Sequence, residues 1–456
     1  MIPSRSGEHM TRTTEPFASD LRRAFWRWHF YAGLLVMPLL LLMAATGAAY
    51  LFKPEIEAAL YRPMMTVEVR PATSSPDAWI AAATQAAGGA VTRVEAPAAP
   101  DRAVRMVAET PRGQRTIFVD PHDAKVLGSV AGLGVMDTVK RVHSLVLLGA
   151  GPNMLIEIVA GWAIVMVVTG VVLWWPKGGS GGVVTVRGRP GQRLFWRDLH
   201  AVTGLFAAAV ILFLGVTGMP WSAVWGDQVR KATNAAGWGA PLPPPAAGAW
   251  GHDKHQPGAA KPWALEGMDL YTGHRGHGAA LGLADAMSRA EAAGLVRPYA
   301  VAIPEPGSDK AWSVSRVVDR AEDARTLYLA GDDGRILADI GWAQYGPAAK
   351  TIQWGVATHQ GQEYGAWNRW LMLAGCVAIW LLGVSSLVMW WKRRPRGTLA
   401  APAAASNPRA RWIVAATVAP LAIIYPLTGA SLLVVLGLDF AMRRIRSARV
   451  PREISP

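Results

Sequence analysis

Two long uncharged stretches, each preceded by a basic and aromatic segment that contains a histidine, constrain the fold of this chain most strongly. The first follows His29 and runs from Phe30 to Phe52. The second follows His200 and runs from Ala201 to Gly226. At a rise of about 1.5 Å per residue, each stretch can cross a hydrocarbon layer of about 30 Å as one helix. We therefore expect both histidines to lie where water meets lipid.

These two stretches are copies of one pattern, since a glycine follows each histidine by four residues and a Thr-Gly pair begins seventeen residues after it. Two more apolar stretches form a second pair. They follow His143 and His359, and in both a Trp-Trp pair begins thirty-one residues after the histidine. The repeated unit is a helix, a polar insert and a helix. The sequence thus predicts a polytopic α-helical membrane protein whose duplicated unit forms a four-helix core, with an additional C-terminal hydrophobic segment.

The net charge of +14 would suit a nucleic-acid-binding protein, but the positions of the basic residues argue against that class. Arginines and lysines gather before the first stretch, between the second and third, and after the fourth. Short basic segments of this kind mark the cytoplasmic side of a membrane protein. We expect a multi-pass protein of a bacterial inner membrane with a cytoplasmic N-terminus, two periplasmic inserts, lipid as a partner and no nucleic acid.

Both inserts carry the pattern of a small α+β domain. A helix is expected at 76–87 in the first insert and at 281–293 in the second. Strands are expected at 91–95, 103–109, 115–119 and 126–130, and again at 299–303, 311–318, 326–329 and 335–340. We expect each insert to fold as a compact domain of its own.

The C-terminal hydrophobic segment, 412–438, is long enough to span, but Pro420 and Pro426 interrupt it. A fifth span would place the basic tail outside, so we favour a broken hairpin over a fifth span. The expected segments in chain order are the cytoplasmic N-terminus 1–24, span 25–52, first insert 53–142, outer segment and span 143–175, cytoplasmic loop 176–199, span 200–226, second insert 227–358, outer segment and span 359–391, cytoplasmic loop 392–411, segment 412–438 and tail 439–456.

This arrangement resembles the PepSY-associated transmembrane family, in which PepSY domains lie between membrane helices. The resemblance rests on the Trp-Arg lead-ins to His29 and His200, the segments around His143 and His359, the Trp-Trp exits and the two inserts, and it covers about residues 20–395. The best understood members resemble haem-containing siderophore reductases of the inner membrane. The resemblance implies a PepSY-like fold for both inserts and a membrane-bound oxidoreductase of the ferric-siderophore reductase type.

The histidines support a haem protein on chemical grounds as well. A histidine at a membrane span is costly without a partner, neutral imidazole binds haem iron, and helical bundles place such ligands on facing helices. We expect two bis-histidine b-type haems, held by His29 with His200 near the cytoplasmic face and by His143 with His359 near the periplasmic face. For the outer pair an alternative remains, in which the glycine-containing segment after His143 folds over the outer surface and moves His143 away from His359. The alternative for each histidine is an interfacial side chain hydrogen-bonded to a neighbour.

Two further sets of residues are candidates for binding. Arg141 could pair with a haem propionate, because the positive-inside rule does not explain an arginine on the outer side. The second insert also carries two His-x-x-His pairs, which form a weaker candidate site for a metal or a ferric substrate. A solvated loop is the alternative for these pairs, since their segment is rich in glycine and proline. The four residues are His252, His255, His274 and His277.

The chain has no strand followed by a glycine-rich dinucleotide-binding turn, so its electrons are expected from a membrane quinol or a separate reductase. Our hypothesis is transmembrane electron transfer through two haems to a periplasmic acceptor, with ferric siderophore as the expected substrate and iron release as the outcome. Catalytic residues other than haem ligands are not predicted. Two alternatives remain, namely a non-enzymatic scaffold whose PepSY-like domains bind a peptide or protease partner, and haem electron transfer to another periplasmic oxidoreductase.

Overall fold

The computed structural model describes residues 14–176, 182–241, 250–252, 261–265, 268–271, 281–305, 307–395, 402–403 and 405–448. The chain divides into two compact units, each built from segments that are distant in the sequence. The helical unit comprises Met1–Ala45, Ser144–Gln228 and Leu373–Pro456. The sheet unit comprises Thr46–His143 and Val229–Met372.

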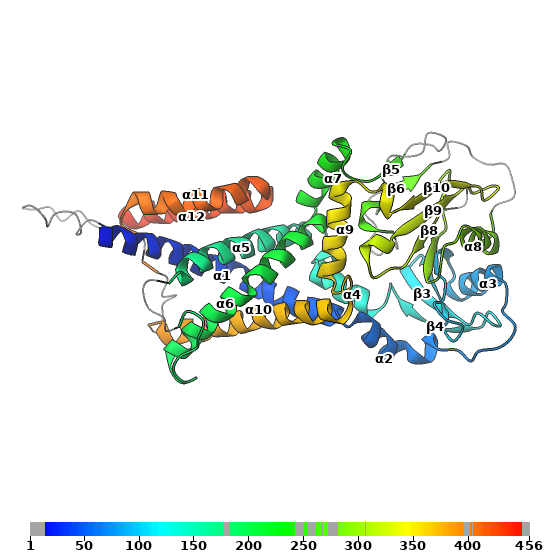
Figure 1. Cartoon of the computed structure of the whole chain (residues 1–456), viewed down its shortest axis with the longest axis horizontal. Helices are drawn as coiled ribbons and strands as arrows, with labels where there is room; N and C mark the ends of the chain where they lie inside the picture. Colours follow the sequence, from blue (N-terminus) through cyan, green and yellow to red (C-terminus); the bar gives the residue numbers. More distant parts are fainter. Residues whose placement is uncertain are drawn as a thin grey trace, which may run out of the picture. The chain divides into compact units, whose positions relative to one another are not determined.

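Four long apolar helices correspond to the four expected spans, and each is long and apolar enough to cross a membrane. They are α1 (Thr14–Tyr50), α5 (Ala150–Trp174), α6 (Arg193–Gly218) and α10 (Gly365–Arg393), which Figure 1 labels. In α5 apolar residues occupy nearly every position, and it is the most enclosed of the four. Apolar helices of this kind are stable only where protein or lipid covers them.

The C-terminal hydrophobic segment forms two helices that pack against each other, which is the hairpin alternative (Figure 1). Helix α11 (Pro408–Ile424) is followed by Tyr425 as its C-cap, and α12 (Pro426–Ala448) begins at the next residue. Tyr425 is extended, as a residue before proline prefers to be, so the chain turns at this point. The hairpin packs on α5, where Gly161 leaves room for the side chain of Thr428.

A buried carboxylate fastens this hairpin to α5. Glu157 is fully buried, and its Oε1 accepts a hydrogen bond from the backbone N–H of Leu427 at 3.2 Å, in the first turn of α12. Its Oε2 accepts from the N–H of Trp225 at 2.9 Å, where α7 (Trp225–Ala235) begins. Helix N-termini carry unpaired N–H groups and partial positive charge, so one carboxylate satisfies both.

The sheet unit contains one antiparallel sheet of eight strands in the order β10-β9-β8-β7-β1-β2-β3-β4. The first insert supplies β1 (Ala90–Glu95), β2 (Val104–Thr110), β3 (Gly113–Val119) and β4 (Val126–Ala131). The second supplies β7 (Tyr299–Ala302), β8 (Trp312–Arg316), β9 (Arg325–Leu329) and β10 (Ile336–Gly341). A separate two-stranded ladder joins β5 (Trp250–His252) and β6 (Met268–Leu270).

The expectation of two separate compact domains is therefore wrong, because the inserts share this sheet. Strands β1 and β7 pair through Val94 opposite Val301 and the residues on either side. Two separate sheets would each leave the edge of its first strand unpaired, and the pairing removes both edges. Helices α3 (Pro76–Ala87) and α8 (Leu283–Ala292) contact each other and contribute to one continuous core. Asp77 at the start of α3 also accepts from the N–H of Leu283 at 2.8 Å.

Short helices precede or follow the sheet segments, and the sequence pattern did not predict them. They are α2 (Lys53–Met65), α4 (Val135–His143), α7 and α9 (Pro347–His359). His143 and His359 are the last residues of α4 and α9, so each histidine precedes its span, α5 or α10. The repeated pattern placed them correctly relative to the spans, but glycine-containing turns separate them from those helices.

We predict that Glu157→Ala lowers the free energy of unfolding by about 3 kcal/mol or more, because two hydrogen bonds to a carboxylate are lost and each contributes about 1.5–3 kcal/mol. Glu157→Gln keeps one acceptor oxygen and should lose about half as much. Thermal unfolding in detergent measures the change, and limited proteolysis near Tyr425 reports release of the hairpin. An alanine variant as stable as the wild type, with no new cleavage, would contradict the role assigned to Glu157.

Candidate functional site: two histidine pairs

His29 on α1 and His200 on α6 face each other within the helical unit. Their ring centroids are 6.2 Å apart and the ring planes are nearly perpendicular, at 89°. Both side chains are half-buried. The structure thus brings together the two residues expected to form the inner pair.

The separation of these rings agrees with the geometry that the expected haem requires. An imidazole nitrogen binds a metal at about 2.0 Å, so two imidazoles on opposite sides of one iron have ring centres about 6 Å apart. Glycines follow each histidine by one helical turn, and a Cβ added at Gly33 or Gly204 would meet only ordinary contacts, at 3.7 and 3.6 Å. The separation of the two rings therefore fits a bis-imidazole site, and the side chains of Met166 and Leu382 pack against the two glycines.

Thr169 on α5 determines which nitrogen of His29 is available. The hydroxyl of Thr169 donates to the carbonyl oxygen of Val165 at 2.7 Å, and His29 Nδ1 lies 3.0 Å from the same hydroxyl. A hydroxyl has one proton, so Thr169 accepts from Nδ1–H of His29. Nε2 then carries the lone pair that binds metals, as in metal sites whose histidine is oriented through its other nitrogen. Gly170 allows this close packing, because a Cβ there would lie 3.2 Å from the His29 ring.

His200 is held in the same way by α10. Its Nδ1 lies 3.2 Å from the carbonyl oxygen of Leu382 and 3.0 Å from the hydroxyl of Ser385. A carbonyl oxygen only accepts, and Ser385 itself donates to that oxygen at 3.1 Å. Nδ1 of His200 therefore carries the proton and Nε2 carries the lone pair. Both imidazoles present their metal-binding nitrogen in the same tautomer.

Sequence reasoning missed Thr169 and Ser385, although a signal for them was present. Each follows a histidine of the second pair by twenty-six residues, His143 in one half and His359 in the other. Each also precedes its Trp-Trp pair by five residues. A hydroxyl residue at matched positions of a repeat, inside an apolar helix, is a candidate partner for a buried polar group.

The outer histidines, His143 and His359, lie in the sheet unit. His143 Nδ1 is 3.0 Å from the hydroxyl of Thr46, the threonine of the first Thr-Gly pair. Burial, together with the nearby His143, lowers the pKa of His359 to about 3. His359 is therefore neutral near pH 7, which is the form of imidazole that binds metals.

Other expected site residues have different surroundings. Arg141 lies on α4, two residues before His143, and is half-buried. Within the described ranges, no group of three or more His, Cys, Asp or Glu residues could hold a metal ion. Of the weaker site, the backbone of His252 lies in β5, and His255, His274 and His277 lie outside the described residues.

Four apolar helices of membrane-spanning length and a shared antiparallel sheet define the class as a polytopic helical membrane protein with a sheet-containing insert. The family model of the PepSY-associated TM region matches residues 26–393. The match covers most of the chain, and this protein belongs to that family. No curated protein matches the chain.

Proposed function

We propose that this protein transfers electrons across a bacterial inner membrane through two bis-histidine b-type haems, and that it reduces ferric iron held by a periplasmic siderophore. The observation that carries this proposal is the pairing of His29 and His200 at 6.2 Å, with both Nδ1 atoms engaged by protein oxygens. A purely interfacial histidine does not need a second histidine at this distance. Bound haem would supply a one-electron couple.

The protein's own residues would hold and orient the ligands. Thr169 and Ser385 keep Nδ1 protonated and so leave Nε2 of His29 and His200 for iron. Along α1, Thr46 follows His29 by seventeen residues, a helical rise of about 26 Å. Thr46 is the hydrogen-bond partner of His143.

Ferric siderophore is the proposed acceptor because reduction itself releases iron. Each Fe(III) takes one electron and becomes Fe(II), which hard oxygen donors hold much less tightly. The electrons would come from a membrane quinol or a separate cytoplasmic reductase. A periplasmic oxidoreductase as acceptor, or a scaffold that binds a peptide or protease partner, are the competing functions.

We predict that the purified wild type shows a b-type spectrum on reduction with dithionite, with about two haems per chain. His29→Ala and His200→Ala should each lose one haem, and His143→Ala and His359→Ala should each lose the other. Visible spectroscopy with haem quantified per chain measures this, and the double variant His29→Ala/His200→Ala should lose no more than either single variant.

The matched control is His122→Gln. His122 is buried in the sheet unit, and its two ring nitrogens lie 2.9 and 3.1 Å from the carbonyl oxygens of Ala72 and Pro100. This variant should keep both haems. A colourless wild type from haem-replete cells would overturn the redox function and favour the scaffold.

We predict that Thr169→Val weakens haem binding at the inner pair about 10- to 100-fold, the usual effect of losing the hydrogen bond that orients a metal-bound histidine. Thr169→Ser keeps the hydroxyl and should restore binding. Competition for haem with apomyoglobin and the midpoint potential of the inner haem are the measurements. Valine and serine variants that both match the wild type would show that Thr169 does not position His29.

We predict that the pre-reduced protein is reoxidised by a ferric hydroxamate siderophore, with one Fe(II) formed per electron lost. Stopped-flow spectroscopy in the presence of a ferrous chelator follows both changes together. A gallium siderophore of the same shape is the control, since Ga(III) is not reduced under these conditions. Reoxidation by neither complex, in a protein that contains haem, would favour a protein acceptor instead.

A further inference from the structure

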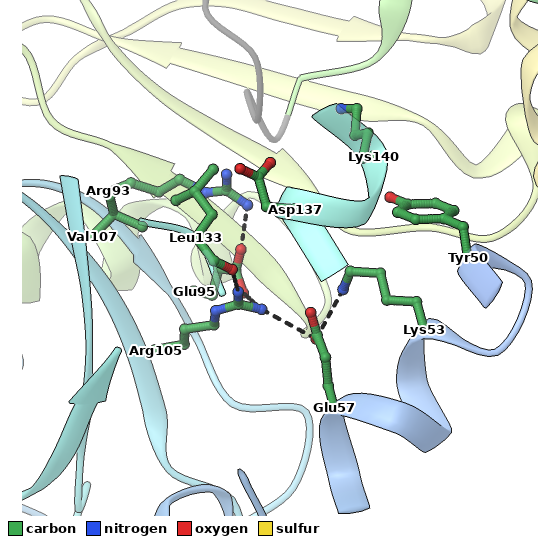
Figure 2. A pocket seen from close by; sticks show the side chains of 10 residues that line it. All are labelled: Tyr50, Lys53, Glu57, Arg93, Glu95, Arg105, Val107, Leu133, Asp137 and Lys140. Atoms are coloured by element: carbon green, nitrogen blue, oxygen red, sulfur yellow. Dashed lines mark hydrogen bonds and ion pairs between the residues drawn. The ribbon is translucent and has the colours of Figure 1, made fainter. Parts of the chain in front are cut away.

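A cavity of about 180 Å³ opens within the sheet unit and is lined mostly by charged side chains. Figure 2 shows residues from α2 and α4 and from strands β1 and β2 pointing into it from different sides. Lys53 and Glu57 come from α2, Asp137 and Lys140 from α4, Arg93 and Glu95 from β1, and Arg105 and Val107 from β2, with Tyr50 and Leu133 completing the lining. None of these residues belongs to the histidine pairs.

Opposite charges alternate around this cavity. Glu57 Oε2 is 3.0 Å from Lys53 Nζ and 3.5 Å from Arg105 Nη1. Arg105 also approaches Glu95 at 3.9 Å, and Arg93 pairs with Glu95. Although burial alone raises it, the pKa of the Glu95 carboxyl is lowered by Arg93, Arg105 and Lys53. Glu95 thus remains charged near neutral pH, and cationic and carboxylate side chains lie in close alternation around the cavity.

A carboxylate oxygen of this network has no hydrogen-bond donor within the part of the chain that the structure describes. Glu57 is 5% exposed, and its Oε1 is buried without a hydrogen bond. A buried carboxylate oxygen without a donor is costly, and it is satisfied by a bound donor if the space beside it is large enough. Glu57 lines the cavity, so a molecule within it can supply that donor.

The size and the charges of the cavity restrict its occupant. A protein cavity of about 150 Å³ holds benzene, so this one suits a molecule of somewhat more than six heavy atoms. Glu57 requires a donor, which an ammonium group supplies. Arg93 and Lys140 offer positive charge on the other side, and Val107 and Leu133 offer apolar surface. A ligand with only a positive charge would meet the cations Arg93 and Lys140 on one side, and a ligand with only a negative charge would meet the carboxylate of Glu57 on the other.

We propose that this cavity binds a small zwitterion of amino-acid size, with its ammonium group on Glu57 and its carboxylate toward Arg93 and Lys140. This site is separate from the haem function and does not depend on it. It lies close to the outer histidines along two helices, however. Lys140 precedes His143 by one turn of α4, and Tyr50 follows Thr46 by one turn of α1. A ligand here can therefore influence His143 and its partner Thr46.

The test uses the full chain in detergent and three probes of one shape, namely L-leucine, 4-methylpentanoate, which lacks the ammonium group, and isoamylamine, which lacks the carboxylate. Isothermal titration calorimetry should show binding of L-leucine and binding at least about 10-fold weaker for either analogue, because each loses one charge-assisted hydrogen-bonding group. Equal binding of all three probes, or of none, would overturn the proposal, and the latter would indicate a hydrated cavity only.

Two variants test the assigned contacts. Glu57→Gln should weaken L-leucine binding at least about 10-fold and leave the weak binding of 4-methylpentanoate unchanged. Lys140→Gln removes a positive charge from the side assigned to the ligand carboxylate, and it serves as the second variant if Glu57→Gln does not fold. It should weaken L-leucine binding at least about 10-fold and leave the weak binding of isoamylamine unchanged. Glu68→Gln, an exposed carboxylate outside the cavity, is the matched control. Wild-type affinity in folded Glu57→Gln or, if that variant does not fold, in Lys140→Gln would contradict the site.

Discussion

The cost of placing a polar side chain in or beside hydrocarbon governs the helical unit. An imidazole there must find partners for two nitrogens, and in His29 and His200 one nitrogen is already satisfied by a hydroxyl or carbonyl oxygen of a neighbouring helix. The other nitrogens belong to rings that face each other. Packing of α5 and α10 against the histidine-bearing helices therefore determines both the tautomer and the free lone pair. Bringing the two rings together requires the bundle as a whole.

Glu157 shows the same constraint with a charged group. A carboxylate with no exposed surface inside an apolar helix is tolerated because two backbone N–H groups donate to it. Both donors lie at the start of helices that the chain would otherwise have to cap in another way. The proline at the start of α12 and the carboxylate on α5 together account for the hairpin. The proline turns the chain, and the carboxylate accepts a hydrogen bond from the first turn of α12.

The sheet unit depends on a different interaction, the pairing of β1 with β7. Each insert contributes four strands and one core helix to this sheet and its core, and without the pairing β1 and β7 would each expose an unpaired edge. The shared sheet removes that edge and gives α3 and α8 a common core. The charged cavity is formed mainly among α2, α4, β1 and β2, which all belong to the first insert. Two separate domains would contain the same strands that Figure 1 shows, but they would lack the β1–β7 pairing that makes the sheet continuous.

The sequence by itself determined the membrane class, the four spans, the core helices α3 and α8 and most strands of the inserts, and the four histidines, because hydrophobic length and repeated spacing are local properties. It identified α3 at its observed limits, and it missed α2, α4 and α9, whose short mixed patterns resemble loops. Only the tertiary structure decided that β1 meets β7, that Thr169 and Ser385 orient the inner histidines, and that one oxygen of Glu57 is left facing a cavity. These features join residues that are distant along the chain, and their partners are determined by packing rather than by sequence period.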